Sequence, residues 1–185
     1  MFVYPEFLSP VALDLFGFGI RWYSISYILG FIYFYLFTRQ NLSYFQLNKK
    51  QMEDLFFYMF LAVIIGGRIG YILFYNINFY IERPLDIFKV WEGGMSFHGA
   101  LFGVVVTSFI FSKKNSIPLF LISDLLSICA PIGIFFGRIS NFINQELIGR
   151  QTDFIISIRY PGEEITRHIS QLYEAIFEGM LPAII

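Results

Sequence analysis

Residues 137–150 hold a dense group of polar side chains directly after an apolar segment. The group consists of Arg138, Asn141, Asn144, Glu146 and Arg150. An arginine guanidinium presents a planar fork that matches the oxygens of a phosphate, and asparagine amides donate to phosphate or glycerol oxygens. The Glu146 carboxylate can hold an arginine in place or accept a hydrogen bond from a hydroxyl. The group therefore indicates a site for an anionic lipid headgroup, and an ordinary polar cluster at a helix end is the alternative.

Three further residues are candidates for the same chemistry, and each has a structural alternative. His98 can accept a proton, because histidine changes charge near neutral pH; alternatively it is bonded to a backbone carbonyl within a helical bundle. Arg68 can stabilise the charge of an anionic group; alternatively, its side chain extends to the membrane surface. Tyr23 contacts lipid at the site or belongs to an interfacial aromatic belt beside Trp22.

Other chemistries find no support in the sequence. The two histidines, His98 and His168, lie far apart, and Cys129 is the single cysteine. The sequence contains neither a nucleophile elbow nor a phosphate-binding glycine loop. The net charge is −1, and no basic run or basic and aromatic stripe indicates nucleic acid. We expect no metal, no cofactor and no nucleic-acid partner.

The composition places these residues in a lipid bilayer. Hydrophobic residues make up 56% and charged residues 15% of the 185 residues, whereas soluble domains carry about 45–50% and about 25%. The apolar stretches approach the roughly 20 residues that a spanning helix needs. The predicted spans are 18–37, 55–75, 94–111, 119–136 and, as a partial fifth, 171–185.

We therefore predict an all-α integral membrane protein, because helices satisfy their own backbone hydrogen bonds in lipid. It is a helical bundle with four complete transmembrane helices, a partial fifth and a small extracytoplasmic segment, forming a single domain over residues 1–185. Residues 141–168 form that outer polar segment, with a short strand over 155–160. The pairs Gly66/Gly70, Gly99/Gly103 and Gly133/Gly137 have the spacing of close helix packing.

Positive charge in the short loops predicts the orientation of the bundle. The loops after the first and third predicted spans contain Arg39, Lys49, Lys50, Lys113 and Lys114. These loops lie on the same side, which should be the cytoplasm. The N-terminus and the polar group after the fourth span should then face outward.

The run from Gly137 to Gly149 resembles the signature of prolipoprotein diacylglyceryl transferases, with Gly-Arg, Asn-Phe, a second Asn, Glu and a closing Gly at these spacings. Residues 21–23, 66–71, 93–99 and 167–174 are similar to further segments of that family, in the same order. Ile169 departs from the family, which usually has proline there. The family also continues through later helices, so we expect this chain to be C-terminally truncated relative to it.

The resemblance implies a multi-pass enzyme of the bacterial inner membrane. It would transfer the diacylglyceryl group of phosphatidylglycerol to the thiol of the lipobox cysteine of a prolipoprotein, which is the first step of lipoprotein maturation. We expect the catalytic residues to be His98, Tyr23 and Arg138, with His98 taking the thiol proton. The expected substrate-binding residues are Arg138, Asn141, Glu146, Gly149 and Arg68.

Two other functions stay open at this point. An anion or lipid transporter would also place arginine and histidine in the membrane, although the repeated halves typical of transporters are absent from the sequence. Flux without covalent change of the donor lipid would favour it. An inactive truncated remnant is the second alternative, and a reading frame that continues past Ile185 would argue against it.

Overall fold

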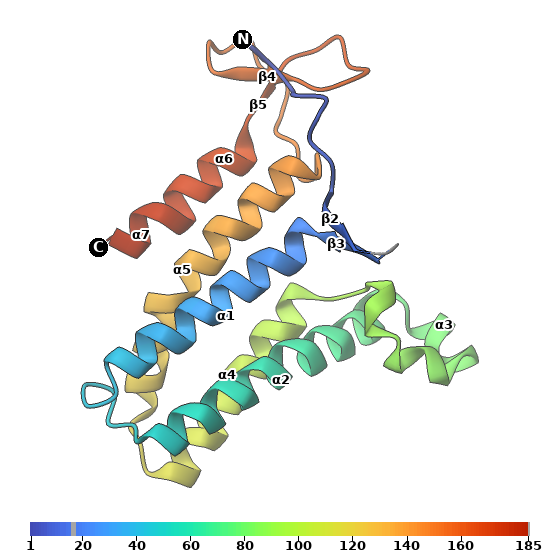
Figure 1. The fold of residues 1–185 in the computed structure, drawn as a ribbon. Coiled ribbons are helices and arrows are strands. Elements are labelled where there is room, and N and C mark those ends of the chain that lie inside the picture. Colours follow the sequence, from blue (N-terminus) through green and yellow to red (C-terminus); the bar gives the residue numbers. More distant parts are fainter. Residues whose placement is uncertain (16–17, 185) are drawn as a thin grey trace. The chain divides into compact units, whose positions relative to one another are not determined.

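Helices dominate the structure, a computed structural model that describes residues 1–15 and 18–184. The four long helices are α1 (Trp22–Gln40), α2 (Lys49–Tyr75), α4 (Phe97–Asn115) and α5 (Leu119–Ile143) (Figure 1). The chain divides into two compact units. The first unit combines Met1–Phe34 with Leu126–Ile185, and the second is Tyr35–Leu125. The single-domain organisation stays a prediction.

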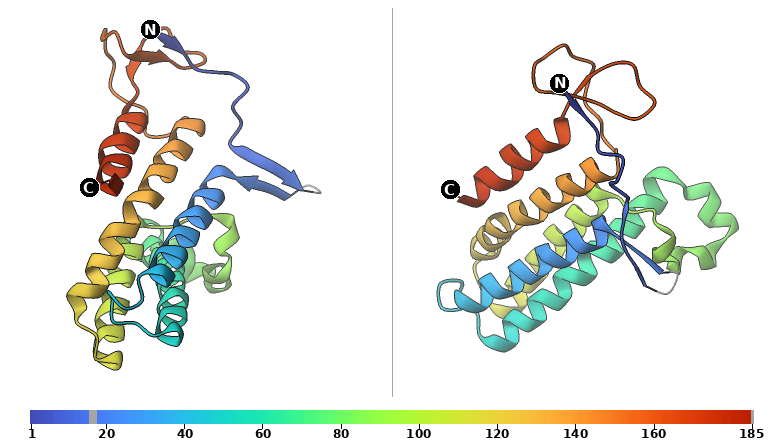
Figure 2. Two further views of the ribbon diagram at one scale, coloured as in Figure 1. Left: turned by 60° about the vertical axis from the view of Figure 1, so that its left-hand side comes forward. Right: turned by 45° about the horizontal axis from the view of Figure 1, so that its top comes forward.

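In the first unit, the start of α1 and a helical segment near the C-terminus both pack against α5. That segment consists of α6 (Ser170–Glu174), the π-helical turn η3 (Ala175–Met180) and α7 (Leu181–Ile184) (Figure 2). Gly30 of α1 faces Gly133 of α5, where an added Cβ on Gly30 would lie 3.3 Å from the Gly133 Cα. Gly179 approaches Phe135 still more closely, because a Cβ there would lie 2.7 Å from the Phe135 Cα.

Two small sheets accompany these helices. Strand β4 (Ser157–Arg159) pairs in parallel with β1 (Phe2–Val3) and antiparallel with β5 (Arg167–His168). The second sheet is an antiparallel pair, β2 (Val11–Leu15) with β3 (Phe18–Arg21). The three-stranded sheet covers a core of Tyr4, Ile158, Tyr160 and Ile169. The Tyr4 hydroxyl donates to the Ile143 carbonyl at 2.7 Å, which ties the sheet to the end of α5.

The second unit is built on the pair α2 and α4, whose backbones touch at glycines. A Cβ on Gly66 would lie 2.5 Å from the Gly99 carbonyl oxygen, and a Cβ on Gly103 would lie 2.6 Å from the Ala62 carbonyl oxygen. These contacts confirm the predicted packing role of the glycine pairs in α2 and α4. The prediction is wrong for Gly137, because a Cβ there would meet no described atom within 4 Å.

The chain between α2 and α4 folds into short turns rather than a long loop. It contains α3 (Ile77–Glu82) and two 3₁₀ turns, η1 (Pro84–Phe88) and η2 (Val90–Glu92).

Several predicted boundaries are corrected by local backbone chemistry. The first span was predicted from residue 18, but residues 18–21 pair with β2 as a strand, and α1 begins at Trp22. The third was predicted from residue 94. Gly93 and Gly94 have positive φ, which a right-handed helix excludes, and α4 begins after Ser96, whose hydroxyl accepts from the Gly99 N–H.

The predicted strand at 155–160 is confirmed as β4, whereas the sheets around it were not predicted. Helix α5 also continues to Ile143, well past the predicted end at 136. The last turns of α5 therefore carry Arg138 and Asn141, and the helix overlaps the start of the predicted outer segment 141–168.

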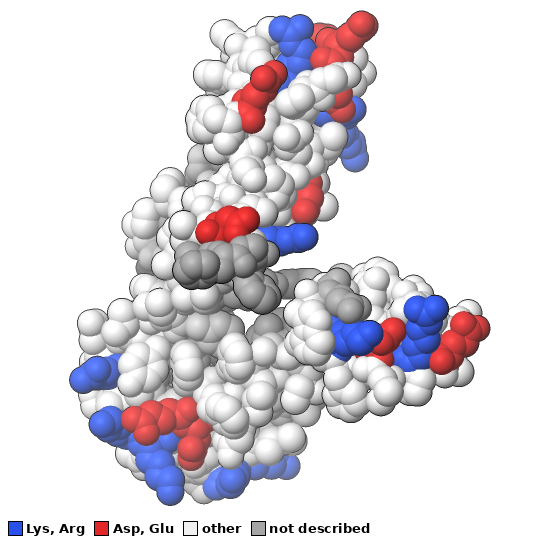
Figure 3. Space-filling view, turned by 45° about the vertical axis from the view of Figure 1, so that its right-hand side comes forward, with Lys and Arg blue, Asp and Glu red and all other residues white. Residues whose placement is uncertain are grey.

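The helices carry the exposed apolar surface expected of a membrane protein. By length and composition, α2 and α5 can each cross a bilayer, with mean hydropathies of 1.9 and 2.2 in their most apolar windows. Exposed apolar side chains of α4 include Phe102, Val105, Val106, Phe109 and Ile110. Charged side chains gather in separate groups with uncharged surface between them (Figure 3). The count of four complete spans and a partial fifth stays a prediction.

Candidate functional site

A hydrogen-bonded cluster joins the start of α1 to the end of α5 in the first unit. The Tyr23 hydroxyl donates to Glu146 Oε2 at 2.5 Å, and Asn141 Nδ2 donates to the Tyr23 hydroxyl. Asn141 Nδ2 also reaches Glu146 Oε2 at 3.4 Å, and Asn144 Nδ2 reaches Glu146 Oε1 at 3.5 Å. Side-chain donors from three residues thus converge on one carboxylate.

The turn that follows α5 places Glu146 in this cluster. Gln145 and Leu147 both have positive φ, a conformation that is uncommon for residues with a Cβ. The Glu146 N–H donates to the Asn141 carbonyl at 2.9 Å, so the chain folds back onto the last turn of the helix. Positive φ on both sides of Glu146 indicates that the surrounding contacts hold this turn in place.

Buried polar residues support the cluster from behind. Gln171 is fully buried, and its Nε2 donates to the Glu146 carbonyl at 2.7 Å. Ser26 of α1 and Ser140 of α5 share a hydrogen bond of 2.6 Å, next to the Tyr23–Asn141 contact along the same helices. These three residues were not predicted from the sequence, although a buried polar side chain in an apolar helix generally needs a partner.

Arg138 lies one helical turn before Asn141 and is held by two carboxylates. Its Nη1 lies 2.8 Å from Glu174 Oε2, and its Nη2 lies 3.0 Å from Glu178 Oε2. Both carboxylates come from the α6–η3 segment. Arg138 and Asn141 share one face of α5, since residues three apart are neighbours on a helix, so a guanidinium and an amide are presented together.

Gly149 is placed where only a glycine fits. A Cβ there would overlap the His168 carbonyl oxygen and would lie 2.5 Å from Ser170 Oγ. The adjacent Arg150 carbonyl accepts from the His168 N–H at 3.0 Å. Gly149 therefore packs the segment after the cluster against the β5–α6 junction, and its expected role in substrate binding stays a prediction.

Arg68 belongs to the second unit and is buried rather than extended to a surface. Its guanidinium donates to four backbone carbonyls of the segment between α2 and α4. They are those of Asp86 (2.6 Å), Ile87 (2.9 Å), Gly93 (2.5 Å) and Gly94 (3.3 Å). Its Cζ also lies 5.1 Å from the centroid of the Tyr80 ring. Arg68 thus holds the 3₁₀ turns in place, and substrate binding by Arg68 stays a prediction.

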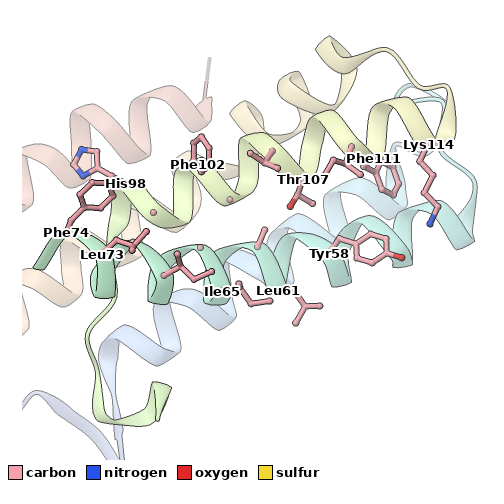
Figure 4. A pocket seen from close by; sticks show the side chains of 18 residues that line it. Tyr58, Leu61, Ile65, Leu73, Phe74, His98, Phe102, Thr107, Phe111 and Lys114 are labelled. Atoms are coloured by element: carbon pink, nitrogen blue, oxygen red, sulfur yellow. The ribbon is translucent and has the colours of Figure 1, made fainter. Parts of the chain in front are cut away.

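His98, also in the second unit, lies exposed near the start of α4. It lines an elongated apolar cavity of about 790 Å³ between α2 and α4, with Lys114 at the far end (Figure 4). Within the part of the chain that the structure describes, no hydrogen bond holds the His98 ring, so the alternative of a carbonyl-bonded histidine is not observed. The ring contacts Phe97 edge-on, with 5.6 Å between ring centroids.

The predicted site residues therefore fall into two groups. The first unit brings together Tyr23, Asn141 and Glu146, with Arg138 on the same face of α5 as Asn141. The second unit contains His98 and Arg68. Among the described residues, no group of three or more His, Cys, Asp or Glu side chains has the arrangement of a metal site.

Known proteins with related sequences cover nearly the whole chain. A model of the family "Prolipoprotein diacylglyceryl transferase" matches residues 10–185. A phosphatidylglycerol–prolipoprotein diacylglyceryl transferase of Ehrlichia canis is 48% identical over 180 residues, which are 96% of this chain and 69% of that protein. Relatives with the same name are 40% identical in Rickettsia canadensis (97% and 70%) and 44% identical in Bordetella avium (98% and 70%).

Proposed function

Because the chain belongs to the prolipoprotein diacylglyceryl transferase family, we propose that it transfers the diacylglyceryl group of phosphatidylglycerol to the thiol of a prolipoprotein lipobox cysteine. The single observation that carries the proposal is the Tyr23–Asn141–Glu146 cluster. Asn141 and Glu146 of this cluster lie on the segment that resembles the family signature, and Asn141 is one helical turn from Arg138.

The reaction is a displacement at the glycerol carbon that carries the phosphate. The cysteine sulfur forms a new bond to that carbon, the carbon–oxygen bond to phosphate breaks, and glycerol phosphate leaves with the bonding electrons. A thiol attacks as its thiolate, so a base must accept its proton. We assign this step to His98, supported by its exposed ring, which no described group engages in a hydrogen bond, at the edge of an apolar cavity.

Negative charge grows on the departing phosphate, and Arg138 and Asn141 are the groups that we propose to stabilise it. Donors that are fixed before the reaction stabilise a developing charge without reorganisation cost. Glu146 supplies that fixation, since it accepts from Tyr23 and from Asn141. With its oxygens already engaged by neighbouring donors, Glu146 is better suited to orienting Tyr23 and Asn141 than to accepting the thiol proton.

The donor lipid also has two apolar tails that need an apolar surface. The cavity between α2 and α4 offers one, lined along its length by side chains such as Leu61, Ile65, Leu73 and Phe102 (Figure 4). Its long, open form between two helices suits an acyl chain that enters from the bilayer. We therefore propose that this cavity accepts an acyl chain.

We place the chain in the bacterial inner membrane as a multi-pass protein with its N-terminus outside. The support is the length and apolar character of α2 and α5 and the exposed apolar surface of α4. The lysines at the start of α2 and at the end of α4 add the positive charge expected on the cytoplasmic side. We retain the four complete spans and the partial fifth in this arrangement.

The test is transfer to a lipobox peptide by the purified protein in nanodiscs that contain phosphatidylglycerol. Mass spectrometry should show the peptide gaining one diacylglyceryl group while glycerol phosphate appears in equal amount. Movement of lipid or anion across the bilayer without a change in peptide mass would instead support the transporter alternative. Neither transfer nor flux in a folded protein would support the inactive remnant.

A further inference from the structure

The guanidinium of Arg138 is occupied on both of its terminal nitrogens. Glu174 contacts Nη1 at 2.8 Å and Glu178 contacts Nη2 at 3.0 Å. A phosphate that uses the guanidinium fork needs two parallel N–H donors. A lipid phosphate that takes the fork formed by Nη1 and Nη2 therefore competes with this pair of carboxylates.

The backbone of the C-terminal helical segment places both carboxylates beside Arg138. Glu174 ends α6, and Glu178 lies within the π-helical turn η3. Turns of this kind are rare and occur frequently at functional sites. Gly179 allows η3 to touch the backbone of α5 at Phe135, one turn before Arg138. The close approach fixes the distance between the carboxylates and the guanidinium.

Two carboxylates exceed what charge neutralisation requires. A charged residue at membrane depth is costly unless it is paired, and one glutamate is enough to pair Arg138. The second adds a net negative charge, which repels an anionic headgroup. The two side chains also differ in exposure, at 33% for Glu174 and 51% for Glu178. Glu178 is the one that an incoming group reaches more easily.

We propose that Glu174 and Glu178 are positioning residues for Arg138, and that the lipid phosphate displaces Glu178 while Glu174 keeps its contact. This inference rests on the proposed function, in which Arg138 binds the phosphate of phosphatidylglycerol. In the absence of lipid, both carboxylates hold the guanidinium in place. When lipid binds, Glu178 leaves Nη2 to the phosphate, and Glu174 orients the guanidinium through Nη1.

Opposite effects on lipid binding follow from these two roles. Glu178→Gln removes a competitor and should tighten binding of phosphatidylglycerol roughly two- to five-fold, the range expected from a partly exposed ion pair. Glu174→Gln removes the group that orients Arg138 and should weaken binding by a similar factor. Two carboxylates that only balance charge would shift binding in the same direction, so the opposite signs separate the two accounts.

The experiment measures the Kd of short-chain phosphatidylglycerol for the full chain in phosphatidylcholine nanodiscs. Glu164→Gln is the matched control, because it removes one carboxylate of the same unit away from Arg138. Glu178→Ala should shift the Kd in the same direction as Glu178→Gln, which keeps the test valid if one of the two variants folds poorly. In an Arg138→Gln background, the gain from Glu178→Gln should shrink, because only the loss of charge repulsion remains.

The outcomes separate this inference from the function on which it rests. If Arg138→Gln leaves the Kd unchanged, Arg138 does not bind the phosphate and the proposed function loses its main contact. If Arg138→Gln weakens binding but Glu178→Gln matches the control, or both glutamate variants shift the Kd in one direction, the positioning roles are overturned.

Discussion

Removing the Tyr23 hydroxyl is the sharpest perturbation of the hydrogen-bonded cluster. Tyr23→Phe keeps the ring and deletes one oxygen atom. That oxygen donates to Glu146 Oε2 at 2.5 Å and accepts from Asn141 Nδ2. The change therefore breaks both hydrogen bonds that join α1 to Asn141 and Glu146, while the Ser26–Ser140 bond between the same two helices remains.

The size of the effect follows from the charges involved. A hydrogen bond to a charged group contributes about 1.5–3 kcal/mol. If the cluster orients Asn141 for the departing phosphate, losing this hydrogen bond destabilises the transition state. The value of kcat/KM then falls roughly ten- to hundred-fold. Asn141 is only 8% exposed, so water restores its lost partner poorly.

The assay is the rate of diacylglyceryl transfer to a lipobox peptide, with thermal unfolding recorded on the same samples. Tyr27→Phe is the matched control, because Tyr27 lies one turn further along α1 with an exposed side chain. We expect Tyr27→Phe to keep its activity. A Tyr23→Phe enzyme that transfers within two-fold of the unaltered protein, at equal stability, would refute the role of the cluster.

Three further substitutions test the packing that positions the site. Gly149→Ala places a methyl group against the His168 carbonyl and Ser170 Oγ and should lower the Tm by about 2–10 °C; Gly137→Ala, which meets no described atom, should leave the Tm nearly unchanged. Gly99→Ala forces α2 and α4 apart at Gly66 and Gly70 and should destabilise by about 1–3 kcal/mol in denaturant unfolding, so a neutral result would contradict the backbone contact. Arg68→Met leaves the carbonyls of the 83–94 segment without their donor and should speed proteolysis there. The exposed Arg83→Met is its control, and equal cleavage of the two would show that Arg68 does not hold the turns.

The sequence was sufficient to predict the long helices, because each is a nearly continuous apolar stretch. Their ends were less predictable, since they depend on local backbone chemistry. The capping box of Asn48 and Gln51 starts α2 before the apolar stretch begins. Positive φ at Gly93 and Gly94 delays α4. Gly137 follows Phe136, but a single glycine costs a helix only about 1 kcal/mol, so α5 continues and carries the polar residues on its last turns.

The site was predictable where it is local in sequence and unpredictable where distant segments meet. Asn141 and Glu146 were visible as a cluster, but their contacts with Tyr23 span 118 and 123 positions. No pattern in the sequence shows that Gln171 lies behind Glu146. Glu174 and Glu178 did leave a signal, as two carboxylates four residues apart in an apolar stretch. Arg68 could not be assigned from its sequence neighbours, because the carbonyls that surround it come from a segment that folds back over it.

The central claim is that the headgroup of phosphatidylglycerol binds at the polar end of α5. Photo-crosslinking with a phosphatidylglycerol that carries a diazirine on its headgroup glycerol tests this directly, followed by peptide mapping. We predict crosslinks within residues 137–149, competed by unlabelled phosphatidylglycerol and reduced in Arg138→Gln. Competed crosslinks that fall only in other segments, with none in residues 137–149, would contradict the account.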